Sequence, residues 1–211
     1  MINTKRALSI IDSLKVLYPN SQTILRWKKP WQLVIAVMLS AQTTDVKVNE
    51  VTAVLFKKYQ SLKALSLASE YDIAKIIHAV NYNKTKAKNV VATAKMLREQ
   101  CKGKVPSSLE ELVLLPGVGR KTANVVLGNL FGSEKGIAVD THVHRLARLW
   151  GLVKGDTPAR IEEELLMLIP EGERHLFTNR CIDYGRQQCA ARCTHTQCPL
   201  RKYVANGDKQ V

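Results

Sequence analysis

The most informative segment of the chain reads Leu115-Pro116-Gly117-Val118-Gly119-Arg120-Lys121-Thr122-Ala123, a glycine-containing turn between two helical patterns. Two glycines allow the backbone to turn tightly and to come close to a ligand. The N–H groups that open the following helix have no intrahelical partner and favour anions. The segment therefore predicts a backbone site for an anion such as a phosphate. The alternative is an ordinary turn between two helices.

The charge of the chain favours the phosphate interpretation. Its 211 residues include 32 Lys and Arg against 18 Asp and Glu, a formal net charge of +14, which indicates a polyanionic partner. Nucleic acid is the leading candidate, and an acidic membrane surface is the alternative. No apolar run approaches the roughly 20 residues of a membrane-spanning helix, and the first residues do not form the apolar segment of a secretion signal. We therefore expect a cytoplasmic protein that does not enter a membrane.

The apolar spacing predicts an all-α fold. The run from Leu33 to Leu39 is continuously apolar, as expected of a helix that is buried on all sides. Ser108 and Glu111 have the spacing of a capping box, and Thr157-Pro158 marks another helix start. The length suits one large domain or two small lobes.

Three segments together resemble a known family. They are Leu39-Ser40-Ala41-Gln42-Thr43-Thr44-Asp45, the turn at 115–123 and Val139-Asp140-Thr141-His142-Val143-His144-Arg145. In their order and spacing they resemble the helix-hairpin-helix DNA glycosylases, and among these the endonuclease III family, over nearly the whole chain. The resemblance implies two helical lobes with a DNA-binding cleft. Residues 22–133 would form a six-helix barrel lobe that contains the helix-hairpin-helix, and residues 1–21 with 134–211 the second lobe.

Lys121 and Asp140 are the candidate catalytic residues. Breaking an N-glycosidic bond requires a nucleophile at the sugar C1′ and a means of stabilising positive charge. A lysine amine that attacks C1′ gives a Schiff base, which permits β-elimination and strand cleavage. The catalytic lysine and aspartate of the family fall at these two positions. The alternatives are a Lys121 that only contacts phosphate and an Asp140 that only caps a helix.

The resemblance also implies residues that contact DNA, because an enzyme that acts on a base inside a duplex must extrude it and fill the gap. Gln42 would fill the gap, and Ser40 and Asp45 would belong to the base pocket. Tyr82 would be the wedge, with Asn81 in place of the usual glycine; the alternative is a ring packed on its own lobe. The other expected contacts are Leu115, Gly117, Val118, Gly119, Arg120, Thr141 and His142.

The cysteines near the C-terminus depart from the family pattern. Endonuclease III relatives usually hold a 4Fe–4S cluster through four cysteines spaced C-x6-C-x2-C-x5-C. Cys189 and Cys198 match the first and third, whereas His195 and Val204 stand where the second and fourth belong. We therefore expect the cluster to be absent or altered, and the chemistry to need no cofactor. An alternative is a zinc ion held by the ligands Cys189, Cys193, His195 and Cys198.

The function implied by the resemblance is that of a bifunctional DNA glycosylase and AP lyase of base excision repair. We expect a monomer that excises oxidised pyrimidines, such as thymine glycol, from double-stranded DNA and nicks the strand at abasic sites. A pyrimidine-dimer glycosylase on the same scaffold is one alternative. The other is a non-catalytic helix-hairpin-helix DNA-binding module, which explains the charge and the hairpin but not the coincidence of Lys121 with Asp140.

Overall fold

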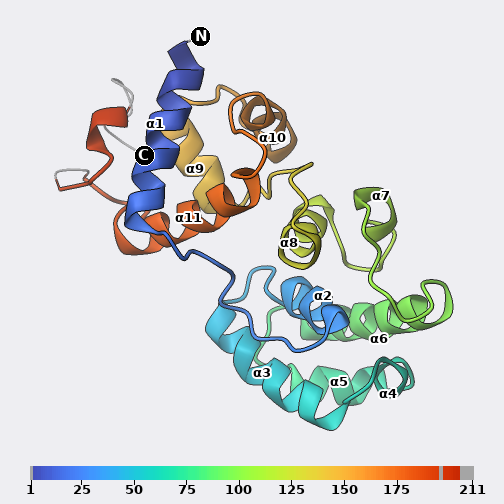
Figure 1. Ribbon diagram of the computed structural model, residues 1–211. Coiled ribbons are helices and arrows are strands. Elements are labelled where there is room, and N and C mark those ends of the chain that lie inside the picture. The colour runs from blue at the N-terminus through green and yellow to red at the C-terminus, as the bar shows by residue number, and fades with distance from the viewer. Residues whose placement is uncertain (1, 195–196, 205–211) are drawn as a thin grey trace. The chain divides into compact units, whose positions relative to one another are not determined.

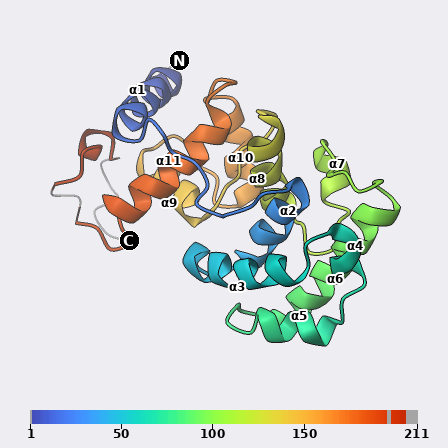
Figure 2. The ribbon, with the colours of Figure 1, turned by 60° about the horizontal axis from the view of Figure 1, so that its bottom comes forward.

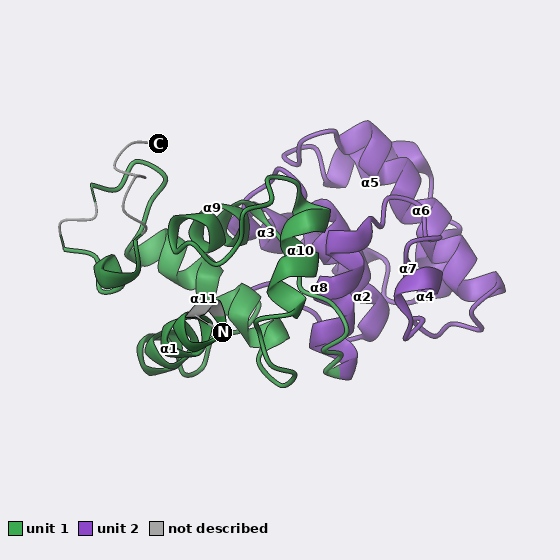
Figure 3. Cartoon of the chain, turned by 90° about the horizontal axis from the view of Figure 1, so that it is seen from above, with its two compact units in different colours: residues 1–23, 132–211 green, residues 24–131 purple. Residues whose placement is uncertain are grey.

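The computed structural model describes residues 2–194 and 197–204, and within these it contains α-helices, one short 3-10 helix and no β-strand (Figure 1). The prediction of an all-α fold is confirmed. The chain divides into two compact units, one formed by residues 1–23 with 132–211 and the other by residues 24–131 (Figure 3).

The unit of residues 24–131 is built around one buried helix. Its helices are α2 (Pro30–Leu39), α3 (Asp45–Lys58), α4 (Leu62–Ser66), α5 (Glu70–Ile76), α6 (Asn83–Glu99), α7 (Leu109–Leu112) and α8 (Arg120–Phe131). Every residue of α2 from Trp31 to Leu39 is buried, and this helix packs against α3, α6 and α8. The expectation of a helix buried on all sides is therefore confirmed.

The unit of residues 1–23 and 132–211 joins the two ends of the chain. Its helices are α1 (Ile2–Leu17), α9 (Thr141–Leu149), α10 (Pro158–Leu166) and α11 (Arg174–Gln187), followed by the 3-10 helix Arg201–Tyr203. α1 lies beside α11 in Figures 1 and 2, and α9 packs on both α10 and α11. Trp150, Tyr184 and Phe177 are the largest fully buried side chains of this unit.

Two helix starts follow the local signals in the sequence. The Ser108 hydroxyl accepts a hydrogen bond from the Glu111 N–H at 3.2 Å and donates to the Glu111 carboxylate at 2.7 Å. The Thr157 hydroxyl accepts from the Arg160 N–H at 3.4 Å, and Pro158 is the first residue of α10. The predicted cap at Ser108 and the predicted helix start at Thr157-Pro158 are confirmed.

Across residues 2–194 and 197–204, no helix combines the length and the apolar character that crossing a membrane requires.

The burial of α2 predicts how substitutions change the free energy of unfolding. Ile35 is completely buried, so Ile35→Ala should lower the free energy of unfolding by about 2–5 kcal/mol, through lost transfer energy and a cavity. Val54 on α3 is 56% exposed, and Val54→Ala should change that free energy by less than about 0.5 kcal/mol. Urea denaturation measures both values, and similar values for the two variants would contradict the central position of α2.

Candidate DNA-binding and catalytic site

The predicted hairpin joins α7 to α8. The Val118 N–H donates to the Leu115 carbonyl at 3.0 Å and closes the turn. Leu115 and Val118 are buried, and both belong to the core of the unit. Their side chains therefore anchor the turn, and any contact that these two positions make with DNA would use the backbone.

The backbone conformation and the neighbouring atoms constrain Gly117 but not Gly119. Gly117 has a φ of +77°, and a Cβ there would lie 2.6 Å from the Asn89 Nδ2 atom on α6. Gly119 has no positive φ, and a Cβ there would meet nothing within 4 Å. The fold thus requires glycine at 117. At 119 the missing side chain leaves the backbone open to a ligand.

α6 supports the hairpin through a residue that the sequence analysis missed. The hydroxyl of Thr93, which is fully buried, donates to the Pro116 carbonyl at 2.8 Å. Thr93 and Asn89 are four residues apart and therefore share a face of α6. Two polar residues at this spacing on a core-facing side of a helix are the signal that could have identified them.

Lys121 occupies the first turn of α8, directly after the hairpin and Arg120. Both side chains are exposed. The start of a helix presents backbone N–H groups and a positive dipole. An amine and a guanidinium therefore stand together with donors that suit a phosphate.

Gln42 and Tyr82 both have left-handed backbones, with φ values of 55° and 58°. Gln42 lies in the loop between α2 and α3, and Tyr82 immediately precedes α6. Both are exposed, and the Tyr82 side chain is 68% exposed. Its ring is therefore not packed on its own unit, contrary to the alternative considered for it.

The expected pocket residues are half-buried and lie at the two ends of the loop that carries Gln42. Ser40 caps the end of α2, and its hydroxyl donates to the Val37 carbonyl at 2.8 Å. Asp45 is the first residue of α3, where Thr44 holds the N-cap position. The Ser40 hydroxyl is thus engaged by the protein backbone in this structure.

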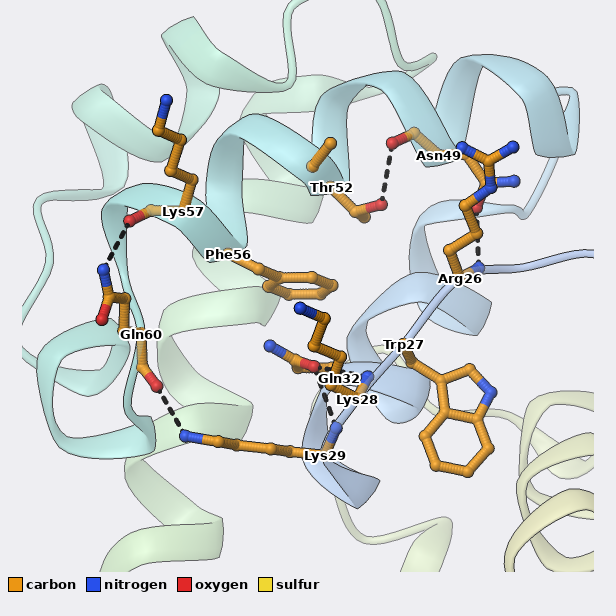
Figure 4. Close-up of a pocket in the computed structure, with 11 residues that line it drawn as sticks. Arg26, Trp27, Lys28, Lys29, Gln32, Asn49, Thr52, Phe56, Lys57 and Gln60 are labelled. Atoms are coloured by element: carbon orange, nitrogen blue, oxygen red, sulfur yellow. Dashed lines mark hydrogen bonds between the residues drawn. The ribbon is translucent and has the colours of Figure 1, made fainter.

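A pocket of about 540 Å³ lies elsewhere on this unit, at the N-terminal end of α2 (Figure 4). Arg26, Lys28 and Lys57 line it together with the ring of Phe56. Neither Ser40 nor Asp45 belongs to its lining. Because Ser40 follows the C-terminal end of α2, this pocket is distinct from the expected base pocket.

Asp140 caps α9, as the sequence allowed. Its Oδ1 atom accepts a hydrogen bond from the Val143 N–H at 2.8 Å. The buried segment 137–139 leads into this cap, and it is held by a bond from the Thr178 hydroxyl to the Ala138 carbonyl at 3.2 Å and by a bond from the Ile137 N–H to Glu162 at 3.3 Å. The cap therefore sits on a fixed backbone.

Cys181 of α11 lies near Asp140, and Thr141 and His142 follow Asp140 on α9. Burial, and then the nearby Asp140 carboxylate, raise the pKa of the Cys181 thiol well above its usual range. Thr141 is exposed and His142 is half-buried. A Cβ at Gly185 would lie 2.2 Å from the His142 Nδ1 atom, so glycine at this position makes room for the imidazole.

Cys189, Cys193 and Cys198 are three cysteines of the same unit, and all three are in the reduced thiol form. Cys189 and Cys198 are buried. The Cys189 sulfur accepts a hydrogen bond from Arg145 at 3.2 Å, and the Cys198 sulfur pairs with the Tyr184 hydroxyl. Burial raises the pKa of Cys189 to about 11. His195, the other candidate ligand, lies outside the described residues.

Comparison with known proteins decides the family. Residues 35–171 match the profile of the HhH-GPD superfamily base excision DNA repair protein. An endonuclease III of Synechocystis sp. is 44% identical over 89% of this chain and 86% of its own length, and one of Bacillus subtilis is 37% identical over 100% and 96%. The chain belongs to the endonuclease III family of the HhH-GPD superfamily.

Solved structures of this family match the fold over nearly the whole chain. A non-covalent endonuclease III–DNA complex has a TM-score of 0.92 at 35% identity, with 99% of this chain and 98% of that chain covered. A trapped endonuclease III–DNA covalent intermediate, the estranged-adenine complex, has the same TM-score and identity, with 99% of each chain covered. The resemblance drawn from the three sequence segments is therefore confirmed.

The expectation about the cofactor is wrong. The relatives that are 44% and 37% identical over most of the chain are endonuclease III proteins, and this family typically carries a 4Fe–4S cluster. An absent or altered cluster, and a zinc ion in its place, are therefore both withdrawn. The expectation rested on one short segment alone, which contains the three cysteines Cys189, Cys193 and Cys198.

The residues that would hold the cluster are the three thiols of this segment, because iron–sulfur clusters bind through cysteine thiolates. Among the described residues, no three side chains of metal-binding type converge on one point, and the structure assigns no fourth ligand. A bound cluster stabilises the segment that ligates it.

The two hairpin glycines predict different outcomes for the same substitution. Gly117→Ala should lower the free energy of unfolding by about 1–3 kcal/mol, because alanine is strained at positive φ and its Cβ would displace Asn89. Gly119→Ala should leave that free energy within about 0.5 kcal/mol and weaken DNA binding about ten-fold, the equivalent of one lost contact worth roughly 1.4 kcal/mol. Thermal denaturation and fluorescence anisotropy with duplex DNA measure the two effects. Equal DNA affinity for Gly119→Ala and the unsubstituted chain would contradict a phosphate site at the hairpin.

Proposed function

We propose that the chain is a bifunctional DNA glycosylase and AP lyase of base excision repair, which excises oxidised pyrimidines from double-stranded DNA and nicks the strand by β-elimination. The observation that carries the proposal is the match, over 99% of the chain, to an endonuclease III trapped as a covalent intermediate with DNA. A covalent intermediate requires a nucleophile, and Lys121 places an exposed amine beside the hairpin.

Lys121 is the proposed nucleophile. Its unprotonated amine forms a bond to the sugar C1′, while the N-glycosidic bond breaks and its electron pair leaves with the base. Opening of the sugar ring gives a Schiff base, which makes the C2′ proton acidic. Loss of that proton expels the 3′ phosphate and nicks the strand. Water then releases the amine and completes the reaction.

Asp140 is the proposed carboxylate partner. Positive charge develops at C1′ as the base departs, and a carboxylate held in a fixed orientation stabilises that charge. The bond from the Val143 N–H supplies the fixed orientation. A carboxylate accepts more hydrogen bonds than this one, so capping and catalysis are compatible.

The proposed DNA interface combines backbone positioning with residues that enter the duplex. The hairpin at 115–119 and Arg120 bind phosphates, which sets the position on DNA without reading sequence. Gln42 and Tyr82 fill the space left by the extruded base, and Ser40 and Asp45 border the base. Thr141 and His142 are proposed to contact DNA next to Asp140.

We interpret residues 22–133 as the six-helix barrel lobe, and residues 1–21 with 134–211 as the second lobe. The net charge of +14 supports binding to DNA through its backbone. The protein would act as a monomer in the cytoplasm, at the nucleoid.

Borohydride trapping tests the nucleophile. Incubation with duplexes that contain thymine glycol, a pyrimidine dimer or an abasic site, followed by reduction, should give a covalent complex with the unsubstituted chain and none with Lys121→Ala. Lys121 is exposed, so Lys121→Ala should fold normally, which thermal denaturation checks. No adduct with any duplex would favour a non-catalytic DNA-binding module. If the pyrimidine dimer gave an adduct and thymine glycol gave none, the substrate would be a pyrimidine dimer.

Asp140→Asn separates catalysis from capping. Asparagine caps a helix nearly as well as aspartate, so the free energy of unfolding should change by less than about 0.5 kcal/mol. The single-turnover rate of base excision should fall by at least about a hundred-fold, a barrier increase of roughly 2.7 kcal/mol. A stable Asn variant with full activity would remove Asp140 from the chemistry.

A further inference from the structure

The loops that carry Gln42 and Tyr82 are bonded to each other. Asn81 lies next to Tyr82, and its Nδ2 atom donates to the Gln42 carbonyl at 2.5 Å. The Asn81 N–H donates to the Thr43 hydroxyl at 3.3 Å. The side chain of Asn81 thus binds the backbone of the other loop, and the backbone of Asn81 binds a side chain of that loop.

Lys86 makes a second connection, one turn into α6. Its side chain is buried, and the Nζ atom donates to the Leu39 carbonyl at 2.9 Å and to the Ala41 carbonyl at 2.5 Å. Burial lowers the pKa of Lys86, and the two carbonyls together with the C-terminal end of α2 provide partners for its ammonium. Lys84 and Lys88, on the same part of α6, are exposed.

The backbone of both loops needs such support. Gln42 and Tyr82 have φ values of 55° and 58°, a region that residues other than glycine rarely occupy unless their surroundings impose it. Of the four hydrogen bonds made by Asn81 and Lys86, three have acceptors in residues 41–43. These acceptors are the Ala41 carbonyl, the Gln42 carbonyl and the Thr43 hydroxyl. The bonds therefore act where the backbone is strained.

We propose that Asn81 and Lys86 are positioning residues for base extrusion, which hold the Gln42 loop and the Tyr82 loop as one preformed unit. This inference rests on the proposed function, in which Gln42 and Tyr82 enter the duplex. A residue that fills a gap in stacked DNA is effective when its backbone is already in place before binding, because no ordering cost is then added to the cost of extrusion. Neither positioning residue needs to touch DNA.

The amide of Asn81 can be removed with little other change. Alanine has no amide with which to reach the Gln42 carbonyl. The Asn81 backbone is outside the left-handed region, so alanine can replace it without strain. Asn81→Ala therefore removes the amide and little else.

The central experiment is a double-mutant cycle that is read by fluorescence. A duplex carries 2-aminopurine beside thymine glycol, and its fluorescence rises when the neighbouring base leaves the stack. All variants are made in the Lys121→Ala chain, so that extrusion is observed without chemistry. Asn81→Ala should slow extrusion by about three- to ten-fold, the range expected for one hydrogen bond. In the Gln42→Ala background the same substitution should change the rate by less than about two-fold.

The cycle distinguishes positioning from simple stabilisation. Gln42→Ala retains the carbonyl that Asn81 binds, so a purely structural role of Asn81 would slow extrusion equally in both backgrounds. That result, or no effect of Asn81→Ala in either background, would overturn the inference. The melting temperature should fall by a similar amount in both backgrounds, since it reports the bond alone.

Lys86→Met, with Lys84→Met as its matched control, tests the second connection. Both substitutions remove one positive charge, so a loss of affinity from weaker attraction to DNA is common to the two. Lys86→Met alone removes the donors to Leu39 and Ala41, and it should slow extrusion at least about ten-fold more than Lys84→Met. Equal extrusion rates for the two folded variants would overturn the role of Lys86. If Lys86→Met fails to fold, Lys86→Arg, which retains a cation and donors, should fold and extrude within about three-fold of the Lys121→Ala parent, and a larger loss would overturn it.

A failure of the proposed function would give different results from a failure of the positioning role. In the first case the unsubstituted chain would give no covalent adduct with damaged or abasic DNA, and the Lys121→Ala parent would show no fluorescence rise. The positioning inference would then fall with it. An adduct and a clear fluorescence rise, combined with equal rates across the cycle, would reject the positioning role and leave the proposed function standing.

Discussion

The carbonyl groups at the C-terminal end of α2 set the main constraint on the unit of residues 24–131. A helix leaves its last four carbonyls without intrahelical partners, and α2 is buried along its length. A buried carbonyl without a donor costs about 1–3 kcal/mol. The Ser40 hydroxyl bonds the Val37 carbonyl and the Lys86 ammonium bonds the Leu39 carbonyl. Because the Lys86 side chain must be buried to do this, the first turn of α6 is fixed against the end of α2.

One face of α6 then determines both candidate DNA-binding segments of this unit. Lys86, Asn89 and Thr93 are spaced by three and four residues, which places them on the same side of a helix. Lys86 binds the loop after α2, Thr93 binds the Pro116 carbonyl, and Asn89 lies against Gly117. The same helix, α6, thus positions the backbone of both the Gln42 loop and the hairpin.

Local signals in the sequence predicted the helices well, because periodicity and caps are properties of short segments. The buried run at 33–39, the cap at Ser108 and the helix start at Thr157-Pro158 followed directly from them. Lys86 could not be found in this way, since it looks like any lysine in a basic stretch, and its burial depends on carbonyls more than 40 residues away. Leu115 and Val118 are a second example. The motif predicted the turn, but only the structure showed that these two side chains are buried in the core. The cofactor expectation rested on one short segment, and the relatives that match most of the chain overturn it.

The two proposed catalytic residues differ in how firmly the protein holds their side chains. Asp140 is fixed by its bond to the Val143 N–H and by the anchored segment that precedes it. Stabilising a developing charge requires this, since a carboxylate that had to reorient would lose much of its effect. Lys121 is exposed on a long side chain, and the proposed chemistry requires it to attack C1′, remain bonded while the sugar opens, and leave. A nucleophile that follows a changing substrate needs rotatable bonds, whereas its electrostatic partner needs none. The helix cap at Asp140 is therefore part of the catalytic design that we propose, because the same hydrogen bond stabilises α9 and orients the acid.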